Sequence, residues 1–233
     1  MFKLFRKELN YYLNNPVGYI VLILFAVFAN FLYIKDIFVI GSASLRPFFG
    51  VLPWLLMIFI PALAMRSFAE EKRSNTIEVL LTLPISETQI VIAKFMALMI
   101  LMGIGLLLTI GLTVSLSMLS KIYYPEILVG YLGAIFLSMT LISLSMFFSS
   151  LTKNQIAAFL GSVITIFVLL VMGTDFFATV FPRTIQEGMT IFTPLYHLQN
   201  FTKGLIDFRS VFYFISMTIT FLFLTVVNLE KRA

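Results

Sequence analysis

Six long stretches without a charged residue dominate the sequence. Each is about as long as the roughly 20 residues that an α-helix needs to cross the hydrocarbon core of a membrane. The chain is 60% hydrophobic and only 12% charged, which lies outside the composition of soluble domains. We therefore predict an all-α membrane protein with one transmembrane domain and six transmembrane helices. The predicted spans are residues 17–34, 47–65, 95–120, 127–152, 154–174 and 210–229.

The boundary between the fourth and fifth spans consists of two polar residues, Lys153 and Asn154. One bent helix cannot cross the membrane twice, so we predict a tight turn there. Lys and Arg are enriched in cytoplasmic loops of membrane proteins. With the N-terminus inside, ten of the sixteen basic residues fall on the cytoplasmic side, so both termini and this turn are predicted to be cytoplasmic. The basic residues behind the net charge of +5 thus indicate the orientation of the chain in the membrane, and no nucleic-acid partner is expected.

In residues 1–15, apolar residues recur at helical spacing, and basic and amide residues occupy the other face. This pattern predicts an amphipathic helix in the cytoplasmic headgroup layer. The alternative is a signal peptide, but the apolar run that follows is long and has no Ala-x-Ala cleavage pattern. Residues 175–209 form the longest predicted external connection. In it, Thr193-Pro194 and Gly204 predict the two ends of a short helix. We expect its apolar side to contain Leu195, Leu198, Phe201 and Leu205.

A polar segment, residues 66–94, separates the second and third spans and carries the densest group of charges in the chain. Asn75, with Glu78 three residues later, resembles a capping box, and Pro84 ends the helix that would follow. Ser86 would open the next helix. The pattern predicts a short helix over residues 76–83 that exposes several aliphatic side chains. Such a helix needs a lipid headgroup layer or a second protein to cover it.

Residues 71–86, EKRSNTIEVLLTLPIS, resemble the cytoplasmic coupling helix of permease subunits in ABC-2 type exporters. They are most similar to the gliding-motility-associated permease and its relatives. The family pattern is Glu, three residues, then Gly-Thr-x-Glu-x-Leu-Leu-x-x-Pro-Ile/Val-Ser. This chain departs from it at Asn75, where Gly is usual. Asn also tolerates a left-handed backbone conformation, so the departure preserves the same backbone option.

The resemblance implies a type-2 ABC exporter fold, in which external helices lie between the last two spans. It also implies that Glu71, Arg73 and Glu78 bond to a separate ATPase while aliphatic residues fill a cleft on it. A second cytoplasmic contact would lie at the turn after the fourth span, at Lys153, Asn154 and Gln155. The implied coupling residues are Glu70, Glu71, Arg73, Asn75, Thr76, Ile77, Glu78, Leu80, Leu81, Pro84 and Ser86.

The chain has no nucleotide-binding motif of the form Gly-x-x-x-x-Gly-Lys-Ser/Thr, so it is not expected to be an enzyme. It is expected to bind no cofactor or metal itself, with ATP and Mg²⁺ on the partner ATPase. The predicted spans also lack ionisable residues, which ion-coupled carriers place in mid-membrane. The driving force is therefore expected from an ATPase, with a second permease subunit, identical or similar, completing the transporter in a bacterial inner membrane. A membrane anchor of a motility or secretion complex, or an ion-coupled carrier, remains the alternative.

Small and hydroxylated residues recur along the third and fourth spans. Such stripes allow helices to pack closely, and their hydroxyls also bond back to the carbonyl four residues earlier. Packing is the simpler interpretation, and a substrate path is the alternative. The candidate path residues are Asn30, Thr109, Thr113, Ser117, Ser138 and Ser145.

Overall fold

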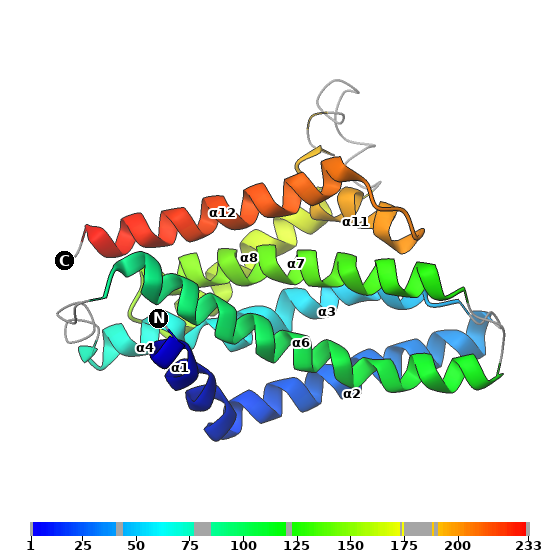
Figure 1. The fold of residues 1–233 in the computed structure, drawn as a ribbon, viewed down its shortest axis with the longest axis horizontal. Coiled ribbons are helices and arrows are strands. Elements are labelled where there is room, and N and C mark those ends of the chain that lie inside the picture. The colour runs from blue at the N-terminus through cyan, green and yellow to red at the C-terminus, as the bar shows by residue number, and fades with distance from the viewer. Residues whose placement is uncertain are drawn as a thin grey trace.

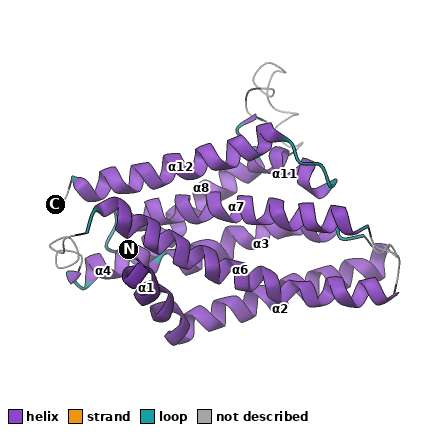
Figure 2. Cartoon of the chain, viewed as in Figure 1, coloured by secondary structure: helices purple, strands orange, loops and turns teal. Residues whose placement is uncertain are grey.

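A computed structural model describes residues 2–40, 44–76, 85–119, 123–172, 174, 188 and 191–231. All regular structure within these ranges is helical (Figure 2), which agrees with the predicted all-α class. The helices are α1 (Phe2–Asn14), α2 (Pro16–Ile40), α3 (Arg46–Ala64), α4 (Arg66–Arg73), α6 (Glu87–Leu119), α7 (Tyr124–Leu151), α8 (Gln155–Val171), α11 (Pro194–Thr202) and α12 (Phe208–Glu230).

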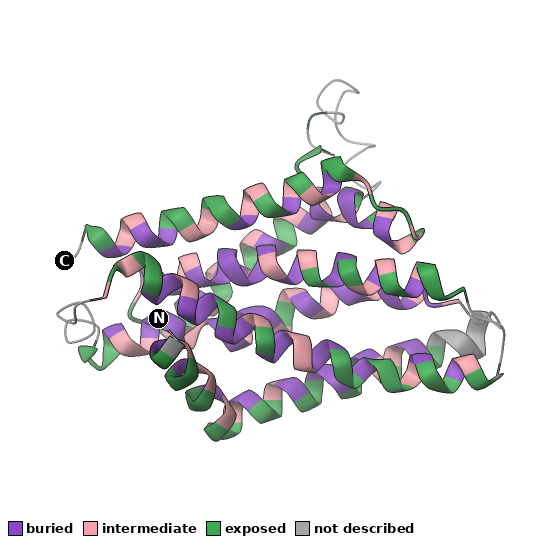
Figure 3. Cartoon of the chain, in the orientation of Figure 1, coloured by how far each residue is buried: buried purple, intermediate pink, exposed green. Residues whose placement is uncertain are grey.

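The long helices lie side by side in a bundle whose central member is α7 (Figure 1). It packs against α3, α6, α8, α11 and α12, whereas α2 packs against α3 and α6. Buried residues lie on the inward faces, and exposed residues on the outer faces are largely apolar (Figure 3). An apolar outer surface is what a bundle surrounded by lipid requires.

The two ends of the bundle differ. The helices α1 and α4, the start of α6, the α7–α8 turn and the C-terminal end of α12 gather at one end, and α11 lies at the other (Figure 1). We call the first the α4 end. The described parts of the segments that were predicted to be cytoplasmic therefore share one end, as a single topology requires.

Five of the described helices are long and apolar enough to cross a membrane. The apolar helix α8 has 17 residues, which is at the lower limit for a span. Helix α6 begins at Glu87, eight residues before its predicted span, and α4 directly follows α3, so much of residues 66–94 is a helical extension of the neighbouring spans. The number six for the spans stays a prediction.

Local capping signals decide where several helices begin. The Asn154 side chain accepts a hydrogen bond from Ile156 N–H at 2.9 Å, and this N-cap separates α8 from α7 across the turn predicted there. The backbone N–H of Gln89 donates to Ser86 Oγ at 3.4 Å at the start of α6. Both residues place a side-chain acceptor opposite N–H groups that lack a partner in the first helical turn.

Helix α11 begins at Pro194, and Gly204 lies beyond its end with a φ of 78°. Leu198 and Phe201 are buried against α7, but Leu205 lies beyond the end of α11 and is 61% exposed, so its prediction as part of the apolar side of this helix was wrong. The physical reason is that the helix ends at Thr202, and the chain turns at Gly204 before Leu205 could continue the helical face.

Candidate functional site

The coupling residues predicted from the sequence divide into two groups. Ile77, Glu78, Leu80, Leu81 and Pro84 lie outside the described residues. The others flank this gap at the α4 end of the bundle, where the structure gives several of them partners within the chain. They are Glu70, Glu71 and Arg73 on α4, Asn75 and Thr76 just beyond it, and Ser86 before α6.

Helix α4 is fastened to the end of α7 through Ser149. The backbone N–H groups of Phe68 and Ala69 both donate to Ser149 Oγ at 3.1 Å, and the hydroxyl donates to the carbonyl of Met65 at 2.8 Å. These groups lie at the junction of α3 and α4, where the helical hydrogen-bond pattern is interrupted. One buried serine hydroxyl therefore satisfies three backbone groups and joins the two helices.

The next residue, Ser150, connects a third helix, α12, to α4 and α7. Its carbonyl oxygen accepts hydrogen bonds from Lys72 Nζ and from Asn228 Nδ2, the latter at 2.7 Å. The Asn228 amide also donates to Ser150 Oγ at 3.0 Å. Lys72 belongs to α4 and Asn228 to α12, so the end of α7 connects both.

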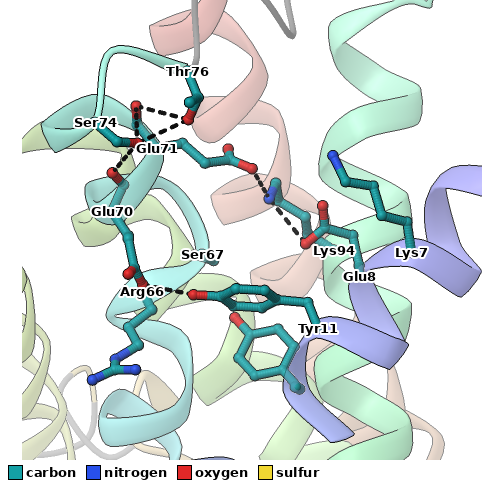
Figure 4. Close-up of a pocket in the computed structure, with 11 residues that line it drawn as sticks. Lys7, Glu8, Tyr11, Arg66, Ser67, Glu70, Glu71, Ser74, Thr76 and Lys94 are labelled. Atoms are coloured by element: carbon teal, nitrogen blue, oxygen red, sulfur yellow. Dashed lines mark hydrogen bonds and ion pairs between the residues drawn. The ribbon is translucent and has the colours of Figure 1, made fainter. Parts of the chain in front are cut away.

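A buried ion cluster joins α4 to α6 and α1 (Figure 4). Lys94 Nζ lies 2.7 Å from Glu71 Oε1 and 3.0 Å from Glu8 Oε2. The side chains of Lys94 and Glu8 are 2% and 7% exposed, and that of Glu71 is 22% exposed. We call Glu8, Glu71 and Lys94 the ion cluster. Its geometry gives Glu71 an internal partner, which differs from the ATPase-bonding role that the resemblance implied.

Glu70 also has a partner within the chain. The Tyr11 hydroxyl on α1 donates to Glu70 Oε2 at 2.8 Å (Figure 4). Burial and the adjacent Glu70 carboxylate raise the pKa of Tyr11 to about 12, so the phenol stays a neutral donor at physiological pH. Arg73, at the end of α4, is exposed instead. Of the charged residues that were predicted on α4, Arg73 is therefore the one placed for an outside partner.

Asn75 adopts a φ of 57°, in the left-handed region. Ser74 caps α4 through its N–H and hydroxyl, which both donate to the Glu70 carbonyl at 2.9 Å, and Asn75 follows it. Asn is one of the residues that tolerate this conformation at the end of a helix. The left-handed option expected from the family pattern is thus used. The capping-box role that its spacing to Glu78 predicts stays a prediction, because Glu78 and most of the helix that Asn75 would cap lie outside the described residues.

A comparison with protein families matches residues 7–229 to the family described as ABC-2 family transporter protein. This chain belongs to the ABC-2 transporter family. A comparison with curated proteins gave no match. As an ABC-2 protein, the chain is a multi-pass membrane protein and the transmembrane component of an ABC transporter. In this family the membrane component is a non-catalytic subunit of the transporter. It typically works with a separate ATPase subunit.

The second predicted contact of this ABC-2 permease lies at the same end of the bundle. Lys153 and Asn154 form the turn between α7 and α8 and are exposed, while Gln155 begins α8 and is half-buried. The Asn154 side chain is used for the helix cap, so the Lys153 side chain is the one that projects from the turn without a capping role.

The hydroxyl residues proposed for a substrate path mostly bond within their own helices. Ser138 and Ser145 donate to carbonyls four residues earlier, at 2.7 Å, and Ser117 donates to Val114. Thr109 bonds to the carbonyl of Leu106 and lies 2.9 Å from the Tyr131 hydroxyl, with Thr113 3.4 Å from the same atom. Asn30 differs, because its buried Oδ1 has no hydrogen-bond partner among the described residues. These contacts support the packing interpretation for the serines.

His197 is enclosed in the ABC-2 fold as a structural residue. Its Nε2 lies 2.8 Å from the carbonyl of Ile191 and its Nδ1 3.2 Å from Ser210 Oγ, and the ring stacks on Tyr213 with centroids 4.1 Å apart. Across the described ranges, the structure brings no three His, Cys, Asp or Glu residues together as metal ligands.

Sequence reasoning missed the residues that hold the α4 end together. Glu8, Lys72 and Asn228 were given no role, although each makes a contact between helices there. A usable signal existed for Glu8: it is an acidic residue on the otherwise basic and amide-rich polar side of residues 1–15, where an opposite charge calls for a partner.

Proposed function

We propose that this chain is the permease of an ATP-driven exporter and that a separate ATPase moves it through residues 74–86. The observation that carries the proposal is the fastening of α4 on three sides. Hydrogen bonds at Ser149 and Ser150 join α4 to α7, Glu71 and Lys94 join it to α6, and Tyr11 and Glu70 join it to α1.

This arrangement supports coupling because a force on the segment after α4 acts on several helices at once. Helix α4 follows α3 with Met65 still in a helical conformation, so the two form one nearly continuous helical path. Packed cores respond to a local push by moving between discrete arrangements rather than by deforming continuously. Movement of residues 74–86 would therefore shift α3, α6 and α7 together and open the bundle on one side of the membrane.

The contacts divide the predicted coupling residues by role. Glu70 and Glu71 brace the α4 end from inside the chain. Arg73 and Lys153, which are exposed, and the aliphatic residues Ile77, Leu80 and Leu81 would then contact the ATPase. Asn75 would set the turn that leads from α4 into the coupling helix.

The complete transporter would contain two ATPase subunits and a second permease, identical to this chain or similar to it. ATP and Mg²⁺ would bind to the ATPase subunits. The α4 end and both termini would face the cytoplasm of a bacterial inner membrane. A role in gliding motility or in secretion would follow from the substrate or the partner complex.

The test is to purify the permease with its ATPase, reconstitute the complex in proteoliposomes and measure ATP hydrolysis and ATPase retention. Leu80→Arg should abolish both the retention of the ATPase and the stimulation of hydrolysis, because a charge replaces an apolar contact. Leu205→Arg, a matched change at an exposed residue of the opposite end, should leave both unchanged.

Two results would reject the proposal. Solute transport by the permease alone, without nucleotide hydrolysis, would indicate an ion-coupled or passive carrier. Retention of the ATPase without any stimulation of its hydrolysis by the wild-type permease would indicate a membrane anchor.

A further inference from the structure

A cavity of about 370 Å³ lies at the α4 end between α1, α4 and α6 (Figure 4). Its volume is within the range of pockets that hold small ligands. Six charged residues line it, three basic and three acidic, so their formal charges cancel. They are Lys7, Arg66, Lys94, Glu8, Glu70 and Glu71.

Two buried atoms in the lining lack a hydrogen-bond partner among the described residues. They are Arg66 Nε, a donor, and Glu71 Oε2, an acceptor. A buried polar group without a partner is costly, and most such groups in folded proteins have one. The two atoms are opposite in charge and hydrogen-bonding sense, so a ligand that carries both an anionic acceptor and a cationic donor would complement both.

The two residues also lie at different positions along α4. Arg66 is the first residue of α4, next to the end of the apolar helix α3, and Glu71 follows five residues later. At 1.5 Å per residue, this places Glu71 about 7.5 Å further along the helix axis, away from the apolar span. Figure 4 shows the Arg66 side chain apart from the group that Glu71, Lys94 and Glu8 form, on the other side of the Tyr11–Glu70 hydrogen bond.

The Arg66 side of the cavity borders apolar residues. A second, small cavity shares Tyr11, Tyr12 and Arg66 with the first and is otherwise lined partly by Val17, Ala62 and Leu63. These apolar residues belong to the start of α2 and the end of α3. A ligand seated here would thus have its anionic group nearest to hydrocarbon and its cationic group furthest from it.

We propose that this cavity binds the headgroup of a phospholipid that carries a primary ammonium group, with the phosphate at Arg66 and the ammonium at Glu71. The order of the two charges matches a lipid in the leaflet at the α4 end, whose phosphate is closer to the acyl chains than its amine. A zwitterionic headgroup also preserves the balance of charges in the cavity. This inference depends on α1 lying in the headgroup layer and is independent of transport or of an ATPase.

The proposal distinguishes between two headgroups of equal charge. A primary ammonium has three N–H donors for Glu71 Oε2, whereas a trimethylammonium group has none. Phosphatidylethanolamine should therefore bind and phosphatidylcholine should bind at least about tenfold more weakly, as the loss of one hydrogen bond to a charged group would cause. Lipids with one or two N-methyl groups should fall in between.

The experiment is a titration of the purified permease, without ATPase, in detergent with each of these lipids. The readouts are the melting temperature and the number of bound lipids by native mass spectrometry. Arg66→Gln should weaken phosphatidylethanolamine binding about tenfold. Arg73→Gln is the matched control, since Arg73 is exposed on the same helix and does not line the cavity.

A second variant separates binding from folding. Glu71→Gln should remove the preference for phosphatidylethanolamine over phosphatidylcholine, and Glu230→Gln, at an exposed site outside the cavity, should retain it. If the Glu71→Gln variant unfolds, the binding measurement on Arg66→Gln alone tests the proposal. Arg66→Gln is expected to fold, because no described hydrogen bond within the chain depends on the Arg66 side chain.

Three results would overturn the proposal. They are equal affinities for the two lipids, equal effects of the two arginine variants, and displacement of the lipid by soluble phosphoethanolamine at equal concentration. The last would show that the acyl chains contribute nothing and that the ligand is a soluble phosphate compound. If displacing the lipid required a large excess of phosphoethanolamine, the result would support a lipid as the ligand.

Discussion

Lys94 and Glu8 are 86 residues apart in the sequence, yet Lys94 Nζ lies 3.0 Å from Glu8 Oε2 in the interior of the protein. The same ammonium group contacts Glu71 and lies 5.4 Å from the centre of the Phe68 ring. One cation therefore organises residues from α1, α4 and α6. Removing one member of a buried ion pair leaves its partner buried and unpaired, which costs more than the pair contributes.

Lys94→Met should destabilise the protein by about 3–5 kcal/mol, because it removes the cation that pairs with the buried Glu8 carboxylate and the partly buried Glu71 carboxylate. The measurement is thermal unfolding of the purified permease in detergent. Lys203→Met, at an exposed residue near the end of α11, is the control and should change the melting temperature little. Equal melting temperatures for the two variants would contradict a structural ion cluster. Adding Glu8→Gln and Glu71→Gln to Lys94→Met should recover part of the loss.

Ser149→Ala should cost about 1–3 kcal/mol, since it removes the acceptor of two backbone N–H groups at the α3–α4 junction. Ser145→Ala is the matched control on the same helix. Ser145 is equally buried but, among the described residues, its hydroxyl bonds to the carbonyl of Leu141 alone, so its loss should cost less than about 1 kcal/mol. The two variants can be compared in one thermal unfolding experiment. A larger effect at Ser145 would indicate that its hydroxyl has a role that the structure does not assign.

Gly133→Ala should loosen α11 from α7. A Cβ at Gly133 would lie 2.5 Å from Phe201 Cβ and 2.8 Å from Phe201 Cγ, which forces the helices apart. Overpacking of this kind typically costs about 1–3 kcal/mol. Gly111→Ala, inside α6, has open space around the added methyl group and should be tolerated. Limited proteolysis near residues 191–207 together with the melting temperature would measure the difference.

Asn75→Gly should preserve both stability and ATPase stimulation, because Gly adopts a positive φ without strain. Asn75→Val should reduce both, because a β-branched residue is strongly disfavoured at a φ of 57°. The expected cost is about 1–2 kcal/mol. If Asn75→Val stimulated the ATPase like the wild type, the turn after α4 would not be part of the coupling path.

The orientation of the protein can be tested directly because it contains no Cys. A single Cys at Asn75 should be protected from a membrane-impermeant thiol reagent in intact cells and should react after the cells are opened. A Cys at Lys121 or at Lys203 should react in intact cells. The reverse pattern would place the α4 end outside and would rule out coupling to a cytoplasmic ATPase.

The sequence predicts well those features that depend on neighbouring residues. Hydropathy identifies the long apolar helices, and Ser86, Asn154 and the Pro194–Gly204 pair mark helix ends because a capping group acts within one turn. The left-handed conformation of Asn75 was likewise accessible from a short pattern.

Contacts between helices could not be predicted in the same way. Glu126 lies five residues after Lys121 in the sequence, but the structure pairs it with Arg46, 80 residues away, through two contacts of 2.9 and 3.2 Å. The partner of Glu71 is Lys94 for the same reason. Which charges meet depends on the packing of helices, and that packing is determined by apolar surfaces spread over the whole bundle.

The two hydrogen bonds to the carbonyl of Ser150 cannot form at the same stage of protein synthesis. Its two donors lie 78 residues before it and 78 residues after it. During translation, Lys72 is already present when α7 inserts, whereas Asn228 arrives only with α12. The contact between Lys72 and Ser150 can therefore form before α12 is synthesised, whereas the contacts of Asn228 can form only after α12 has been added to the bundle.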